Sequence, residues 1–185
     1  HRCELLDRTK VKTDMHFCSD NHWDLEVCDV ISTDSTTHWY TFKGKNGKSF
    51  PARIVCPDVF PSVKKGDIID GQIVAFADKI SKMSDGATSD GDIYAENDEC
   101  VVFNGVIVDA LDREFSFHDN KSIFWELDVK TENGCISVLC AKNTIDFEPE
   151  IGDSISVHAI ISMDVALGCE NREDAEFYVN MYQGL

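Results

Sequence analysis

The two halves of the chain repeat each other at an offset of about 86 residues, and this repeat limits the possible folds more than any other feature. Segment 38–47 aligns without a gap on segment 125–134, and the Gly-Asp-Ile-Ile of 66–69 matches the Gly-Asp-Ser-Ile of 152–155. Two copies of one small β unit predict a tandem array. Where the copies agree, we expect the residue to serve the fold, and where they differ, it is a candidate for function.

Each copy has a hairpin signal at its centre. Asn46-Gly47 and Asn133-Gly134 both lie between runs that alternate apolar and polar residues, a pattern typical of a hairpin with a type I′ turn. Pro51 indicates an edge or a bulge in the returning strand. The last segment, 176–182, fits a strand or a helix, and the repeat favours a strand. Alternation predicts strands at 23–31, 38–45, 48–56, 67–77 and 92–95, and again at 101–110, 122–132, 135–141 and 153–163.

Five short strands, a central hairpin and a long connection before the fifth strand resemble the oligonucleotide/oligosaccharide-binding (OB) fold. We therefore expect an all-β protein of two tandem five-stranded OB-like barrels, related by the internal repeat. The expected domains are an N-terminal extension at 1–22, a first barrel at 23–97 and a second, acidic barrel at 98–185. A pair of small β-sandwiches or SH3-like barrels is the alternative. The resemblance implies a binding surface on strands two and three and on the loops beside them.

The charge of the chain is strongly negative and uneven. The net charge is −17; residues 1–97 contribute −4, from 12 Lys and Arg against 16 Asp and Glu, and residues 98–185 contribute −13. The second half should attract basic partners and repel nucleic acid and membrane surfaces. No run of 18 apolar residues is present, so we expect no transmembrane helix.

The eight cysteines favour free thiols over disulfide bonds. Cys56 and Cys140 occupy matching places at the end of the third strand of each copy, where a small apolar residue fits a core. This indicates a reducing compartment and a cytoplasmic protein. The chain begins at His1, so a leader that has been removed stays open as an alternative.

The first hairpin is one candidate binding surface. Alternation points Tyr40 and Phe42 inward, so the residues between them should face outward. An aromatic ring among cations is suited to stacking on single-stranded nucleic acid. The alternative is that the ring packs against another part of the protein. The outward set is Trp39, Thr41, Lys43, Lys45, Lys48 and Arg53.

The second hairpin carries carboxylates at the corresponding positions. They predict a surface that docks a basic protein, as in an inhibitor, an immunity protein or a nucleic-acid mimic. We expect a non-catalytic binding protein that docks a basic protein surface, with single-stranded nucleic-acid binding as the alternative. The acidic set is Asp109, Asp112, Glu114, Glu126 and Asp128.

Motifs for catalysis and for cofactors are missing from the sequence. There is no G-x-S-x-G, Walker loop, G-x-G-x-x-G or H-E-x-x-H. We therefore expect no enzyme activity and no cofactor. A scatter of zinc-type ligands near the N-terminus lacks the C-x-x-C spacing of a zinc ribbon or finger, so we predict no metal there and keep the set as an alternative. Its members are Cys3, His16, Cys18, His22 and Cys28.

Overall fold

The computed structural model describes residues 21–33, 37–54, 63–84, 92–117 and 120–165, and this part of the chain is built from strands. The expectation of an all-β protein is confirmed, and most strands lie within a few residues of their predicted positions. Beyond strands, it holds one 3₁₀ turn, η1 (Lys142–Thr144). The strands are β1 (Trp23–Thr33), β2 (His38–Lys43), β3 (Ser49–Ile54), β4 (Ile68–Lys82), β5 (Tyr94–Ala95), β6 (Cys100–Phe117), β7 (Asn120–Thr131), β8 (Gly134–Ala141) and β9 (Ser154–Val165).

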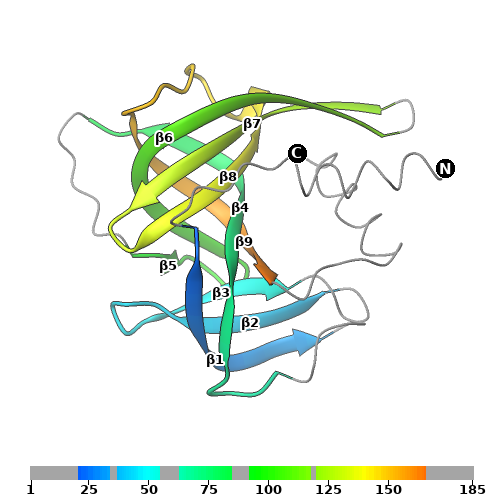
Figure 1. Ribbon diagram of the computed structural model, residues 1–185, viewed down its shortest axis with the longest axis vertical. Coiled ribbons are helices and arrows are strands. Elements are labelled where there is room, and N and C mark those ends of the chain that lie inside the picture. Colours follow the sequence, from blue (N-terminus) through cyan, green and yellow to red (C-terminus); the bar gives the residue numbers. More distant parts are fainter. Residues whose placement is uncertain (1–20, 34–36, 55–62, 85–91, 118–119, 166–185) are drawn as a thin grey trace.

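All nine strands belong to one connected sheet. Their order is β1-β2-β3-β9-β4-β8-β7-β6-β5, and β1 also pairs with β4 while β9 also pairs with β6. Figure 1 shows β4 and β9 running between the β1–β3 end and the β6–β8 end of the molecule. These two strands therefore connect the two repeats.

The additional pairings close two circuits of five strands each. One circuit runs β1-β2-β3-β9-β4 and returns to β1, and the other runs β6-β7-β8-β4-β9 and returns to β6. In each circuit one contact is parallel, β3 with β9 or β8 with β4. Both circuits contain β4 and β9, so each repeat supplies one strand to the circuit of the other.

The expectation of two separate tandem barrels, one per repeat, is not confirmed. The expected fifth strand at 92–95 is reduced to β5, which pairs only with the start of β6 among the described strands, and β9 takes its place in the first circuit. The expected strand at 176–182 lies outside the described residues. The boundary at residues 97–98 falls in the turn between β5 and β6 and stays a prediction, because β4 and β9 pair across it.

The repeat is visible in matching turns before β4 and β9. The Gly66 N–H donates to the Val27 carbonyl and the Gly152 N–H to the Ile107 carbonyl, both at 2.8 Å. Both glycines have positive φ, 92° and 97°, which explains why the sequence keeps glycine there. The aspartate after each glycine accepts a hydrogen bond from the backbone N–H three residues earlier. The Gly-Asp match thus reflects one turn used twice.

The hairpins form where the sequence predicts them, with different turns. In the first, the Gly44 N–H donates to the Lys48 carbonyl at 2.8 Å and Gly47 has φ 80°, which makes a three-residue loop with a left-handed glycine. In the second, Thr131 pairs directly with Gly134, so the two-residue loop is Glu132-Asn133. The predicted type I′ turn with Asn-Gly at its centre is therefore wrong in both copies.

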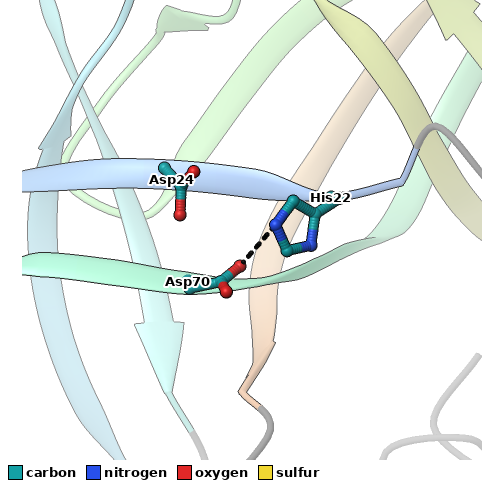
Figure 2. A group of neighbouring side chains, drawn as sticks. All are labelled: His22, Asp24 and Asp70. Atoms are coloured by element: carbon teal, nitrogen blue, oxygen red, sulfur yellow. Dashed lines mark ion pairs between the residues drawn. The ribbon is translucent and has the colours of Figure 1, made fainter.

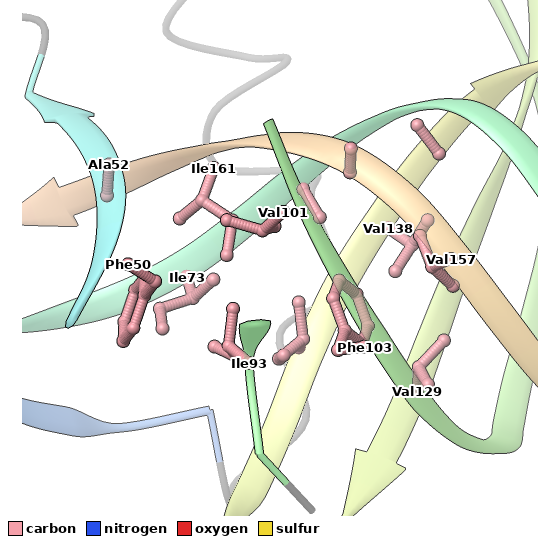
Figure 3. Packing of buried hydrophobic residues seen from close by; sticks show 14 of the residues in the cluster. Phe50, Ala52, Ile73, Ile93, Val101, Phe103, Val129, Val138, Val157 and Ile161 are labelled. Atoms are coloured by element: carbon pink, nitrogen blue, oxygen red, sulfur yellow. The ribbon is translucent and has the colours of Figure 1, made fainter. Parts of the chain in front are cut away.

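One hydrophobic core fills the protein and draws on both repeats. Figure 3 shows Phe50 and Ala52 of β3 in the same cluster as Phe103 of β6 and Val129 of β7. Tyr40 and Phe42, predicted to point inward, are buried, and so are Phe50, Ala52 and Ile54 of the returning strand. Of the two other positions predicted to face inward, His38 is half-buried and Cys56 lies outside the described residues.

Cys140 is a free thiol in this core, as expected. Burial raises its pKa to about 11, so it stays protonated and serves packing. Within the part of the chain that the structure describes, no helix is long and apolar enough to span a bilayer.

His158 joins three parts of the chain outside the core. Its Nδ1 contacts Asp78 of β4, and its Nε2 contacts Glu96 in the turn before β6. The hydrogen bond to Asp78 raises the pKa of His158; partial burial opposes this rise, and the charges of Asp78 and Glu96 add to it. The protonated ring can donate to both carboxylates at once, so it holds β4, β9 and the turn together.

Gly105 of β6 is a position where packing excludes any side chain. A Cβ there would lie 2.5 Å from Val129 Cγ1 and 2.8 Å from the Lys130 carbonyl oxygen. We expect Gly105→Ala to lower the free energy of unfolding by about 1–3 kcal/mol, because backbone and a β-branched side chain must both shift. Urea unfolding measures this. The control is Val106→Ala at the exposed neighbour, expected to cost less than about 1 kcal/mol. Equal costs would contradict the close approach.

The His158 contacts predict a pH dependence of stability. Because the folded pKa is raised, their contribution is complete below the unfolded value of about 6.5 and is lost as pH rises through the folded pKa. We expect His158→Asn to reduce the fall in melting temperature between about pH 6 and about pH 9. Asp78→Asn should reduce it in the same direction. An unchanged pH dependence in both variants would show that the contacts do not stabilise the fold.

Candidate functional site

A groove of about 570 Å³ lies along β1, in the half of the molecule that contains the first hairpin. Its volume falls in the range of small-molecule sites. It is bordered by residues 22–26 of β1 and the chain just before it, residues 43–45 and Phe50 of the first hairpin, Ile68, residues 92–93 and Asn133. The groove thus collects residues from both repeats.

The groove has an apolar floor and charged sides. Its buried members Trp23, Leu25, Phe50 and Ile93 belong to the hydrophobic core. Around them lie four exposed charged side chains: Asp24 and Glu26 on β1, and Lys43 and Lys45 on the hairpin. Within the described ranges, no ion pair is formed by these lysines or by these two acids. Charges of both signs are therefore available to a ligand.

Two hydrogen bonds between the repeats fix one border of this groove. Trp23 Nε1 donates to the Cys135 carbonyl at 3.0 Å, which ties the start of β1 to β8. The Asn133 side chain donates to Asp92 Oδ1 at 3.3 Å, which ties the second hairpin to the segment before β5. The groove depends on these contacts because they bring the two repeats together.

Three potential metal ligands meet at the groove. His22 and Asp24 border it, and Asp70 of β4 lies directly opposite Asp24 in the β1–β4 ladder. Their ligand atoms lie within 4.8 Å of one another, and His22 Nε2 is 3.1 Å from Asp70 Oδ1. Figure 2 shows the three side chains and this ion pair. All three are exposed. One imidazole and two carboxylates are a ligand set that suits a divalent cation.

Trp39 does not stand free on the first hairpin. It is half-buried, and the guanidinium of Arg53 lies 5.9 Å from its ring centroid. Arg53 Nε also donates to Ser162 Oγ at 2.8 Å, and its guanidinium lies 5.5 Å from the centre of the Phe76 ring. Arg53 thus contacts β4 and β9, and the half-buried Trp39 ring lies beside its guanidinium.

The other hairpin residues separate into two groups. Lys43 and Lys45 are exposed at the groove, whereas Lys48 lies over the Tyr94 ring at 5.9 Å. Thr41 is half-buried in the middle of β2. The structure places Trp39 directly opposite Arg53, with Thr41 and Lys43 at alternate positions on the same face of β2. The binding role of this set stays a prediction.

Two of the predicted acidic contact residues are buried, which corrects their assignment to a docking surface. Glu126 is 2% exposed and Asp128 is 3% exposed. Ser137 Oγ donates to Asp128 at 3.3 Å, and the Asn21 amide donates to Ser137 at 3.2 Å, so a buried polar chain lies against this face of β7. Side chains alternate along β7 as predicted, but the face of the strand that was expected to meet solvent is buried like the other face.

Asp109 also has a structural role. β6 has a bulge between Ile107 and Asp109, and the Asp109 carboxylate accepts a hydrogen bond from the Ala110 N–H at 2.9 Å. Asp29 does the same for the Val30 N–H at the matching bulge of β1. Because the two copies agree, Asp109 serves the fold.

Two members of the predicted acidic set remain exposed. They are Asp112, which pairs with Lys142 at 2.6 Å, and Glu114.

The N-terminal set of metal ligands is mostly outside the described residues; these are Cys3, His16 and Cys18. Cys28 is half-buried in β1, and His22 joins Asp24 and Asp70 instead. Sequence reasoning missed these two acids because they are 46 positions apart and meet only through the β1–β4 ladder. A comparison of the two copies could have indicated these acids, because the matching cross-strand pair in the second repeat, Asn104 with Ser156, is uncharged.

Comparisons with known proteins give no family. No family model matches the sequence, and no curated protein matches it. Among solved structures, the cytoplasmic molybdate-binding protein ModG, crystallised with molybdate bound, matches 82% of this chain and 99% of its own at 12% identity and a TM-score of 0.42. At these values the likeness is one of β-rich architecture and assigns no ligand to this chain.

Proposed function

We propose that this protein is a non-catalytic binding protein and that the groove along β1 is its ligand site. The observation that carries the proposal is the groove itself, in which an apolar floor is flanked by exposed charges of both signs. Lys43 and Lys45 suit an anionic group, and Asp24 and Glu26 suit a cationic one. The ligand class that matches is a small zwitterion, such as an amino acid or a short peptide end.

The sheet topology supports a finer account of the scaffold. A circuit of five strands in which the first closes on the fourth fits the partly open five-stranded Greek-key barrel of the OB fold. We infer two OB-like units that exchange strands, with β9 completing the first and β4 the second. The groove then lies at the first hairpin, next to the surface through which OB folds bind their ligands.

Docking of a basic protein is a second proposal, and it uses fewer acidic residues than the sequence predicts. It rests on the net charge of −17 and on the exposed Asp112 and Glu114. An oligolysine peptide is the probe, and Asp112→Asn with Glu114→Gln should weaken its binding. Single-stranded nucleic-acid binding is the alternative. Salt-sensitive quenching of tryptophan fluorescence by oligo-dT would support it.

The groove proposal predicts that zwitterions stabilise the protein and that the hairpin lysines matter. We expect at least one member of a panel of free amino acids and dipeptides to raise the melting temperature in a saturable way. Lys43→Ala with Lys45→Ala should weaken that ligand about tenfold or more, because a hydrogen bond to a charged group contributes about 1.5–3 kcal/mol. Isothermal titration calorimetry measures the affinity.

The matched control is Lys79→Ala, an exposed lysine of β4 that does not border the groove. It should leave the affinity unchanged. The proposal fails if no zwitterion of the panel binds. It also fails if Lys79→Ala weakens binding as much as the combined Lys43→Ala and Lys45→Ala variant does.

A further inference from the structure

We propose that His22, Asp24 and Asp70 form a binding site for a divalent transition-metal ion, with Zn²⁺ as the best-matched ion. The site shares Asp24 with the groove, but the proposal does not require the zwitterion ligand, because the metal alone is the probe.

The first argument is the arrangement of the ligand atoms. Zn–N and Zn–O bonds of about 2.0–2.2 Å separate the ligand atoms of a tetrahedral site by about 3.4 Å. His22 Nε2 and Asp70 Oδ1 are already 3.1 Å apart, and the whole set lies within 4.8 Å. Because all three side chains are exposed, small rotations are enough to bring them into coordination distance.

The second argument is electrostatic. Asp24 and Asp70 are directly opposite each other in an antiparallel ladder, and like charges at such positions destabilise a sheet. A divalent cation between them would convert this repulsion into attraction. It would also clamp β1 to β4, the pairing that closes the first circuit of strands.

The third argument comes from the repeat. The turns and registers of the two copies correspond, so Asp24 opposite Asp70 matches Asn104 opposite Ser156, and His22 matches Val102. The second copy closes its circuit with the same ladder and no charged pair. The fold therefore does not require the two carboxylates, which leaves ligand binding as a reason for them.

The ligand types favour a transition metal over Mg²⁺. Imidazole binds Zn²⁺ and its neighbours in the transition series well, whereas Mg²⁺ prefers oxygen ligands and retains its waters. Three protein ligands leave a coordination position for water or another ligand, as in open zinc sites. Because His22 and Asp24 border the groove, that position lies beside it.

The test is calorimetric titration of EDTA-treated, desalted full chain with ZnCl₂, and in parallel with MgCl₂. We expect Zn²⁺ to bind and to raise the melting temperature, and Mg²⁺ to bind at least tenfold more weakly. Asp24→Asn and Asp70→Asn should each weaken Zn²⁺ at least tenfold. Asp98→Asn, at an exposed turn outside the site, is the matched control and should bind as the wild type does.

Asp24→Asn separates loss of the site from loss of the fold. It removes the opposed charges and keeps the His22–Asp70 ion pair, so without metal the variant should melt at the wild-type temperature or above it. Stability in EDTA together with a lost response to Zn²⁺ supports the site. The proposal is overturned if the wild type does not bind Zn²⁺, or if both aspartate variants bind it as the wild type does.

Cysteine thiolates are the competing ligands in this chain. Co²⁺ distinguishes them, because Co–thiolate coordination gives an intense charge-transfer band in the near ultraviolet and nitrogen–oxygen coordination does not. We expect Co²⁺ binding without this band, unchanged in Cys18→Ser and in Cys28→Ser. A thiolate band that disappears in either cysteine variant would assign the metal to the N-terminal cysteines and overturn the proposal.

Discussion

The pairing of β4 with β9 is the contact on which the rest of the structure depends. It is antiparallel, and Ala75 lies opposite Ile161, two positions that are 86 residues apart and equivalent in the repeat. Ile73 opposite Met163 corresponds in the same way to Ala77 opposite Ala159. The ladder therefore relates the two copies as a local twofold axis would, and each copy gives the other a strand. Loss of this ladder would open both circuits at once.

The shared strands also explain why the protein has one continuous core. Ile73 and Ile161 lie in the same cluster as Phe50 from the first repeat and Phe103 from the second. A unit of roughly 90 residues buries a limited fraction of its surface and is only marginally stable by itself. Exchange of strands joins two such units, so each is stabilised by apolar area that its own segment does not supply.

Chemical specialisation follows the differences between the copies. The turns with Gly66 and Gly152 and the bulges with Asp29 and Asp109 agree, and each makes the same hydrogen bond in both copies. The groove charges do not agree: Glu26 corresponds to Val106. One copy has therefore kept the fold with uncharged or apolar side chains where the other presents charge. Comparison of the two copies therefore separated structural residues from candidate binding residues better than the net charge of each half did.

The predicted acidic surface shows the limit of sequence patterning. Alternation correctly separates Leu127 and Val129 from Glu126 and Asp128, because side chains alternate along any strand. Whether the second face meets solvent depends on what packs against it. Ser137 lies opposite Asp128 within the second hairpin, but Asn21, which donates to Ser137, comes from a distant part of the chain that the pattern of the hairpin does not indicate. Trp39 differs from its prediction for the same reason, since Arg53 is drawn toward Phe76 and Ser162.

The sequence by itself determined the strand content, the two hairpins and most of the inward positions of the first hairpin. These depend on residues near one another in the chain, whose periodicity and backbone preferences are readable locally. Only the tertiary structure decided which strands close each circuit, which carboxylates are buried, and that Asp24 meets Asp70. Those outcomes depend on pairings between residues about 46 to 110 positions apart, and local preference carries no information about such partners.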